Sequence, residues 1–177
     1  AIEPLKLSEF LRDKHLILAN GKFDVKFLRK AGVKNLQIGF DTMYAGHTVN
    51  EIRTNGLKVH AWIYTYHGGY DSEVEQFFDG DKKAHREYGS LPQEVLMKYA
   101  AMDAAITFQV AHALKKELEE LHDLISGKQG FASPYHYYYD IVLPAVNLFS
   151  EIETQGIPID QDKLQDLVAK AKSRKEE

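Results

Sequence analysis

The residues from Leu16 to Asp24 constrain the fold more than any other stretch of this chain. A short apolar run, long enough for one buried strand of a parallel sheet, ends in Asn20-Gly21 and leads into a helix with Asp24 in its first turn. Ligands of open α/β sheets bind at the carboxyl ends of the strands, where a carboxylate is suited to a divalent cation. A lone Asp here also fits a simple helix cap. A metal site therefore requires a partner carboxylate.

A second strand-helix unit follows the first. Residues 36–40 predict a strand, and Asp41-Thr42-Met43 turns that strand into a helical segment that runs towards Asn50. Two such units in succession favour a parallel pair of strands covered by helices. Residues 57–64 predict a further helix, and residues 66–90, with many Gly and charged residues, predict a loop.

The strongest helical pattern follows Ser90-Leu91-Pro92-Gln93, which has the form of a capping box, and extends to Gly127. Tyr99 and Asp103 lie four positions apart, so they share one face of this helix at a separation of roughly 6 Å. A buried carboxylate without a partner costs several kcal/mol, and a metal ion shared with Asp24 would offset that cost. The simpler alternative is a solvent-facing Asp103 beside a core Tyr99.

The second half of the chain predicts further helices. Residues 127–133 are typical of a linker, and residues 135–154 form a long helical pattern that Pro144 interrupts. Asp160 is placed to cap a last helix. A cluster of four tyrosines in this half is expected to pack a helix against its domain rather than to stack on nucleic-acid bases; it comprises Tyr135, Tyr137, Tyr138 and Tyr139.

Composition and charge exclude several classes of protein. The chain has no cysteine, which rules out disulfides, thiolate metal sites and a Cys nucleophile. It has no run of 18 apolar residues, so no segment is expected to span a membrane. The first residues lack a signal-peptide pattern, and a cytoplasmic location is expected. Because the net charge is −4, contact with DNA would need a local patch or metal ions.

Four segments, in a fixed order, resemble family A DNA polymerases. The run from Asn20 to Asp24 is similar to the second motif, Asn-x-x-x-(Phe/Tyr)-Asp, of the 3′-5′ proofreading exonuclease domain, with one residue fewer between Asn and Phe. The run from Tyr99 to Asp103 is similar to the third, Tyr-x-x-x-Asp. Phe40-Asp41-Thr42-Met43 resembles the Asp-Thr segment between them. The stretch from residue 143 to 160 resembles the opening of the polymerase domain, where a helix ends in Glu-x-x-Gly-(Ile/Val)-x-(Ile/Val)-Asp.

The resemblance implies an α/β chain with a truncated RNase H-like exonuclease fold, mostly helical with a short residual parallel sheet. It divides the chain into a partial 3′-5′ exonuclease domain, residues 1–128, and a linker with the first helices of a polymerase domain, residues 129–177. The implied function is proofreading, in which nucleotides are removed from a single-stranded DNA 3′ end by two-metal hydrolysis. Such chemistry uses Mg²⁺ or Mn²⁺ ions held ~4 Å apart.

The resemblance also implies a role for each residue of the two motifs. Asp24 and Asp103 would be catalytic metal ligands, and Tyr99 would orient the nucleophile. Asn20 and Phe23 would contact the terminal nucleotides of the DNA. In a bacterial or viral replication context, these residues would belong to a DNA-directed DNA polymerase.

The family's first motif, Asp-x-Glu on the opening strand, has no counterpart before residue 16, and Asp71-Ser72-Glu73 has its letters only in a predicted loop. We therefore expect a polymerase fragment with little nuclease activity by itself, whose missing segments come in cis or from another chain. Two alternatives stay open. One is a ribonuclease D-like 3′-5′ exoribonuclease, which shares the second and third motifs, and the other is a non-catalytic nucleic-acid-binding or scaffolding remnant.

Overall fold

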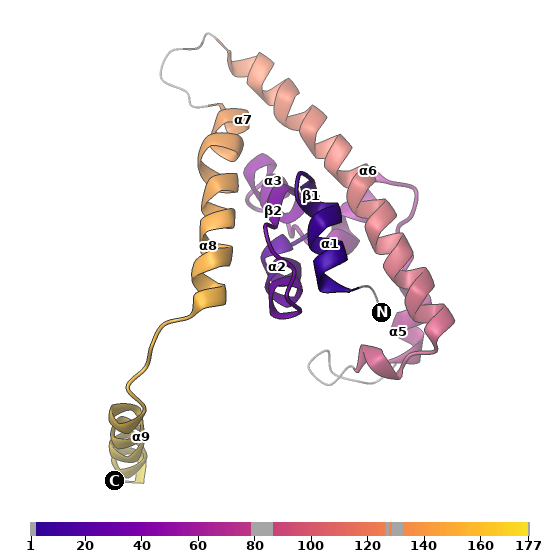
Figure 1. The fold of residues 1–177 in the computed structure, drawn as a ribbon. Coiled ribbons are helices and arrows are strands. Elements are labelled where there is room, and N and C mark those ends of the chain that lie inside the picture. The colour runs from indigo at the N-terminus through magenta and orange to yellow at the C-terminus, as the bar shows by residue number, and fades with distance from the viewer. Residues whose placement is uncertain (1–2, 79–86, 127, 129–132, 177) are drawn as a thin grey trace.

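The computed structural model describes residues 3–78, 87–126, 128 and 133–176. These residues are mostly helical, with a two-stranded parallel sheet, as the sequence predicts (Figure 1). In chain order the elements are α1 (Pro4–Leu11), β1 (His15–Leu18), α2 (Gly21–Lys30), β2 (Gln37–Asp41), α3 (Thr42–Val49), α4 (Leu57–Tyr64), α5 (Ser72–Phe77), the 3₁₀ turn η2 (Tyr88–Ser90), α6 (Gln93–Ile125), α7 (Pro134–His136), the π-helical segment η3 (Tyr137–Val142), α8 (Leu143–Gln155) and α9 (Gln161–Glu176).

The two strands pair in parallel, as the two strand-helix units predict. Leu16 pairs with Ile38 and Ile17 with Phe40, so Gly39 is an extra residue in β2 that forms a bulge. A Cβ atom at Gly39 would overlap the His15 side chain on β1. Glycine therefore allows the two backbones to approach at this point.

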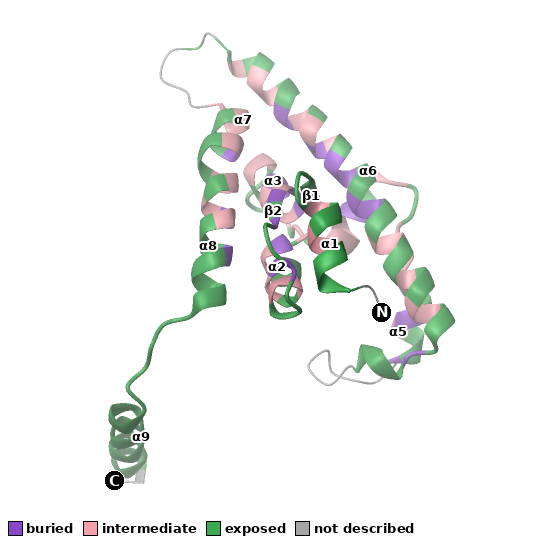
Figure 2. Ribbon diagram, viewed as in Figure 1, coloured by how far each residue is buried: buried purple, intermediate pink, exposed green. Residues whose placement is uncertain are grey.

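Helices α6 and α8 flank the sheet on opposite sides (Figure 1). One core joins the sheet to α6 and η3, where buried residues pack together: Phe40, Ala45, Ala61, Ile106, Val110, Ala111, Leu114, Leu118 and Tyr138. A second core joins α2 and β2 to α8 through Val25, Val33, Leu36, Ile38 and Val146. In Figure 2 the buried positions of α6 and α8 face the sheet, whereas α9 is exposed along its length.

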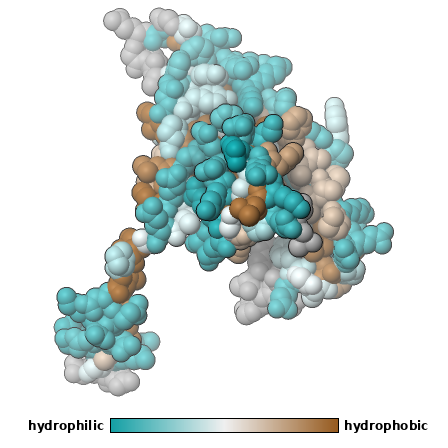
Figure 3. Space-filling model, in the orientation of Figure 1, coloured by the Kyte–Doolittle hydropathy of each residue, from teal (hydrophilic) through white to brown (hydrophobic). Residues whose placement is uncertain are grey.

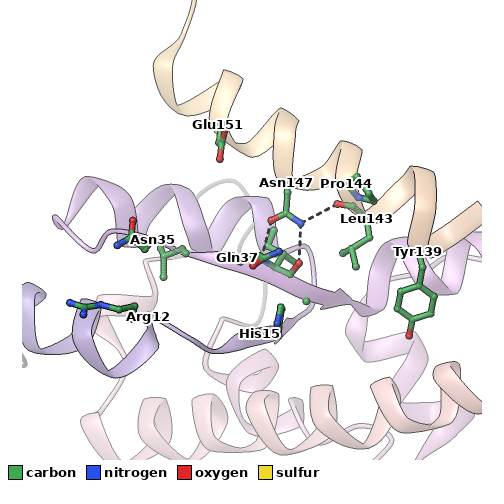
Figure 4. Close-up of a pocket in the computed structure, with 12 residues that line it drawn as sticks. Arg12, His15, Asn35, Gln37, Tyr139, Leu143, Pro144, Asn147 and Glu151 are labelled. Carbon is green, nitrogen blue, oxygen red and sulfur yellow. Dashed lines mark hydrogen bonds between the residues drawn. The ribbon is translucent and has the colours of Figure 1, made fainter.

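The outer edge of β2 is covered by α8 through an amide side chain. Asn147 Oδ1 accepts from Ile38 N at 3.0 Å, and Asn147 Nδ2 donates to Ile38 O at 2.9 Å, so this side chain bonds β2 as a neighbouring strand would (Figure 4). Lys22 and Glu153, 2.6 Å apart, also join α2 to α8. A groove of about 720 Å³ lies beside this contact, with His15 and Gln37 in its lining.

Two sequence predictions between residues 66 and 93 are wrong. The predicted loop contains α5 and η2. Helix α5 is held in place because Val74 and Phe78 are buried against Leu91. The helix has too few residues to show a clear hydrophobic period in the sequence. Residues 79–86 of that loop lie outside the described residues. The predicted capping box does not form either: Pro92 is the N-cap residue of α6 and offers no side-chain cap, and Ser90 Oγ donates to Glu87 O at 2.8 Å.

The predicted interruption at Pro144 is confirmed. Pro144 has no N–H to continue the helical ladder, and the backbone before it widens into the π-helical segment η3. The capping role of Asp160 is confirmed by a bond from Lys163 N to Asp160 Oδ1 at 3.1 Å. The predicted linker at 127–133 lies largely outside the described residues.

The tyrosine cluster packs as expected, apart from Tyr137, which is 50% exposed. Tyr138 is fully buried, with its ring 5.2 Å from that of Phe40, and Tyr135 and Tyr139 border the same core. Within the described part of the chain, no helix combines the length and the hydropathy needed to cross a membrane.

Candidate functional site

The carboxyl ends of the two strands meet at Asp41, the last residue of β2. Its buried carboxylate accepts from Asn20 N at 3.2 Å and Gly21 N at 2.7 Å at the start of α2. It also accepts from Met43 N at 3.0 Å and Tyr44 N at 3.4 Å at the start of α3. Burial raises the pKa of Asp41, although these four N–H groups act in the opposite direction. One side chain therefore caps two helices.

The turn between β1 and α2 explains how Asp24 reaches this edge. Asn20 adopts the left-handed conformation, with φ of 62°, which Asn tolerates better than most residues. A Cβ atom at Gly21 would lie 2.7 Å from the Leu18 side chain, so only glycine fits there. The helix therefore begins directly after the strand, and its first turn carries Phe23 and Asp24.

The predicted DNA contacts and the first carboxylate are accessible. Asn20 and Asp24 are exposed, and Phe23 is 60% exposed. The Phe23 ring lies 4.8 Å from that of Phe27, one turn further along α2, so an aromatic surface adjoins Asp24.

The second carboxylate lies on α6 among tyrosines. Asp103 is half-buried, and Tyr70 Oη donates a short hydrogen bond to its Oδ1. The Tyr70 ring stacks on Tyr99 with centroids 5.9 Å apart, and Tyr99 stacks on Tyr88 at 6.2 Å. The prediction that Tyr99 and Asp103 share a helix face is confirmed. The simpler alternative of a solvent-facing Asp103 beside a core Tyr99 does not hold, because both side chains are half-buried.

Asp103 and Tyr99 both have raised pKa values. Burial raises the pKa of Asp103, although hydrogen bonds from Tyr70 and Tyr99 oppose the shift. Burial and the charge of Asp103 raise the pKa of Tyr99 to about 12, so its hydroxyl keeps its proton at neutral pH. Tyr99 is thus available as a hydrogen-bond donor.

The structure brings Asp24 and Asp103 close enough for their charges to interact. The pKa of Asp24 is raised first by partial burial and then by the negative charges of Asp41 and Asp103, although its own backbone N–H lowers it. A carboxylate whose pKa is raised by neighbouring negative charges is suited to a cation, which would remove the repulsion.

The donor set of this site fits a hard divalent ion. Within the described ranges, no cluster of three or more Asp, Glu, His or Cys side chains has the arrangement of a metal site. Two carboxylates nevertheless suit Mg²⁺, which is usually held by one or two carboxylates together with waters and substrate phosphates. Asp24 and Asp103 would supply the two carboxylates if such an ion were bound here.

The remaining candidates have contacts of their own. Asp71 and Glu73, which have the spacing of an Asp-x-Glu motif, form ion pairs: Asp71 with Lys58, and Glu73 with Lys98 at 2.8 Å. The groove beside α8 contains neither Asp24 nor Asp103. Sequence reasoning missed Tyr70, which lies 33 residues before Asp103, and no periodic pattern in its loop indicated it.

Comparison with known proteins places the chain among DNA polymerases. The family model described as 3′-5′ exonuclease matches residues 3–119, more than half of the chain. The DNA polymerase of Escherichia phage T5 is 29% identical over 168 residues, which cover 85% of this chain and 18% of that protein. DNA polymerase I of Chloroflexus aurantiacus is 30% identical over 152 residues, covering 84% and 14%, and that of Treponema pallidum is 31% identical over 158 residues, covering 86% and 14%.

The chain thus spans less than a fifth of the length of these relatives. No solved structure gives a significant match. The matched region, residues 3–119, contains both motifs and both strands. The chain belongs to the 3′-5′ exonuclease domain family of family A DNA polymerases.

Proposed function

We propose that Asp24, Asp103 and Tyr99 form part of a proofreading site that removes nucleotides from a single-stranded DNA 3′ end. The observation that carries this proposal is that Asp24, on the helix directly after β1, lies close enough to Asp103 of α6 for their charges to interact, and that Asp103 is hydrogen-bonded by Tyr99. Asp24 and Asp103 would hold Mg²⁺ or Mn²⁺. A bound ion of this kind stabilises the negative charge of phosphodiester hydrolysis and activates water.

The other residues of the site have separate tasks. The Tyr99 hydroxyl donates to Asp103, and its oxygen would accept a hydrogen bond from the attacking water and orient it. The exposed ring of Phe23 offers a face on which a terminal base stacks, a contact worth about 1 to 3 kcal/mol per base. The exposed side chain of Asn20 lies at the start of the same helix and contacts the terminal nucleotide.

We further propose that residues 1–128 are the nuclease part and that residues 129–177 lead into a polymerase domain. The match of the exonuclease family to residues 3–119 supports the first boundary. The relatives are DNA polymerases of phages and bacteria, which supports DNA as the substrate and a cytoplasmic setting. They do not favour the ribonuclease D alternative.

The experiment is digestion of a 5′-labelled single-stranded DNA oligonucleotide with Mg²⁺ or Mn²⁺. The chain is tested alone and fused at Ala1 to the upstream segment of the phage T5 polymerase. We expect efficient digestion by the fusion, since two-metal chemistry needs more carboxylates than the described two. Asp24→Asn and Asp103→Asn should each slow the fusion at least about 100-fold, because each removes a ligand charge.

Asp123→Asn is the matched control, because Asp123 is an exposed residue of the same helix as Asp103. A fusion that digests DNA equally well with and without Asp103 would contradict the proposal. Faster digestion of an RNA oligonucleotide of the same sequence would instead favour the exoribonuclease alternative. No digestion by any version would favour a scaffold.

A further inference from the structure

We propose that Tyr70 is a positioning residue for the metal-binding carboxylate of Asp103. This inference rests on the proposed function of Asp103. The Tyr70 hydroxyl donates to Asp103 Oδ1 from a different part of the chain, which fixes the direction in which the carboxylate points. Tyr99 also hydrogen-bonds this carboxylate, so tyrosines from two parts of the chain hold it.

Helix α4 holds the loop that carries Tyr70. Gly68 and Gly69 lie against the indole of Trp62: a Cβ atom at Gly68 would overlap the ring, and one at Gly69 would lie 3.3 Å from it. Gly69 also has φ of +73°, a conformation that glycine adopts without strain. The backbone before Tyr70 is therefore seated on α4 in a way that only glycines permit.

The residue after Tyr70 is fixed by the same helix. Lys58 of α4 forms ion pairs with Asp71 and, at 2.6 Å, with Glu75. Tyr70 thus lies between two anchors, the Trp62 ring before it and the Lys58 ion pair after it. Its ring also stacks on Tyr99 at an interplanar angle of 10°. This packing leaves the hydroxyl little freedom to move away from Asp103.

The chemistry of metal ligands gives this hydrogen bond a function. Carboxylates that bind metals are themselves hydrogen-bonded to neighbouring groups, and loss of such a partner lowers metal affinity or activity about 10- to 100-fold. Tyr70 has this relation to Asp103. The expected consequence of its loss is a carboxylate that is held less firmly and binds the ion more weakly.

The test is a titration of the full chain with Mn²⁺. Binding is measured from the paramagnetic broadening of the backbone amide signals around Asp103. Tyr70→Phe keeps the stacked ring and removes only the hydroxyl, so we expect its apparent Kd for Mn²⁺ to rise about 10- to 100-fold. Tyr88→Phe is the matched control, because the Tyr88 ring, like the Tyr70 ring, stacks on Tyr99. It should bind Mn²⁺ like the unchanged chain.

The outcomes separate the two proposals. If Asp103→Asn leaves Mn²⁺ binding unchanged, the proposed metal role of Asp103 fails, and this inference fails with it. If Asp103→Asn weakens binding while Tyr70→Phe binds equally well or more tightly, only the role of Tyr70 is overturned. Trp62 is the sole tryptophan, so its fluorescence shows whether the loop stays seated in each variant.

Discussion

Asp24, Asp41 and Asp103 each have a raised pKa, and burial is the first cause in every case. A raised carboxyl pKa means that the folded chain holds the proton more tightly than the unfolded chain does. At neutral pH, loss of the proton from these carboxyl groups therefore makes the fold less stable than it would be with the proton bound. Such a cost is typical of functional sites, where charge is arranged for a ligand rather than for stability.

Replacement of Asp24 by Asn tests this reasoning. Because the folded-state pKa lies above the ordinary value of 3.8, the contribution of Asp24 to stability is full below that value and is lost as the pH rises through the folded-state pKa. Asp24→Asn should therefore raise the Tm at pH 7, and the gain should shrink as the pH falls towards 4. Thermal unfolding followed by circular dichroism at several pH values measures this.

The control for that series is Asp13→Asn, since Asp13 is exposed in the turn before β1. It should leave the Tm unchanged at every pH. A lower Tm for Asp24→Asn at pH 7 would show that the helix N-terminus stabilises the charge of Asp24 more than its surroundings destabilise it.

At the scale of elements, the Asp41 side chain links the first strand-helix unit to the second at the carboxyl ends of the two strands. Its carboxylate binds backbone N–H groups at the start of both α2 and α3, and its own N–H donates to Tyr138 Oη at 2.8 Å. The position of Asp24 therefore depends on a residue of the neighbouring strand. Helix caps of this kind contribute about 0.5 to 2 kcal/mol each.

Asp41→Ala should consequently lower the free energy of unfolding by about 1 to 4 kcal/mol, the sum of two lost caps. Urea denaturation followed by circular dichroism measures the change. Asp160→Ala removes a cap of α9, whose described side chains are all exposed, and should change the stability by less than about 0.5 kcal/mol. Equal effects of the two substitutions would argue against the bridging role of Asp41.

At the scale of the whole molecule, the sheet is held between α6 and α8, whereas α9 stands apart from both (Figure 1). Every described residue of the segment from Gly156 to Lys175 is exposed, including Ile157 and Ile159, at 80% and 59%. Brown hydrophobic atoms lie along the connection to α9 in Figure 3. This segment buries little surface, so it contributes little to the stability of the rest.

Removal of residues 157–177 should therefore shift the Tm by less than ~2 °C, the change that about 0.5 kcal/mol produces in a chain of this size. Differential scanning calorimetry measures the shift. A second truncation, after residue 142, also removes Val146 and Asn147, which pack against and hydrogen-bond β2. It should abolish the cooperative unfolding transition. A large Tm decrease on the first truncation would mean that α9 packs against the domain.

The sequence alone determined the local features of this protein. An apolar run, an Asn-Gly turn and four-residue spacing on a helix depend only on neighbours in the chain. They were sufficient to predict both strands, the long helix and the candidate residues Asp24, Tyr99 and Asp103. The motif order was sufficient to predict the family, which the comparisons show.

Only the tertiary structure decided which distant groups meet. Asp41 caps α2 because β1 and β2 pair, Tyr70 reaches Asp103 because α4 seats its loop, and Asn147 covers β2 across 109 positions of sequence. Each of these contacts joins a single polar side chain to a group on another element. Such contacts have no period and no local signature, because packing of the elements, rather than the order of residues, brings the two groups together.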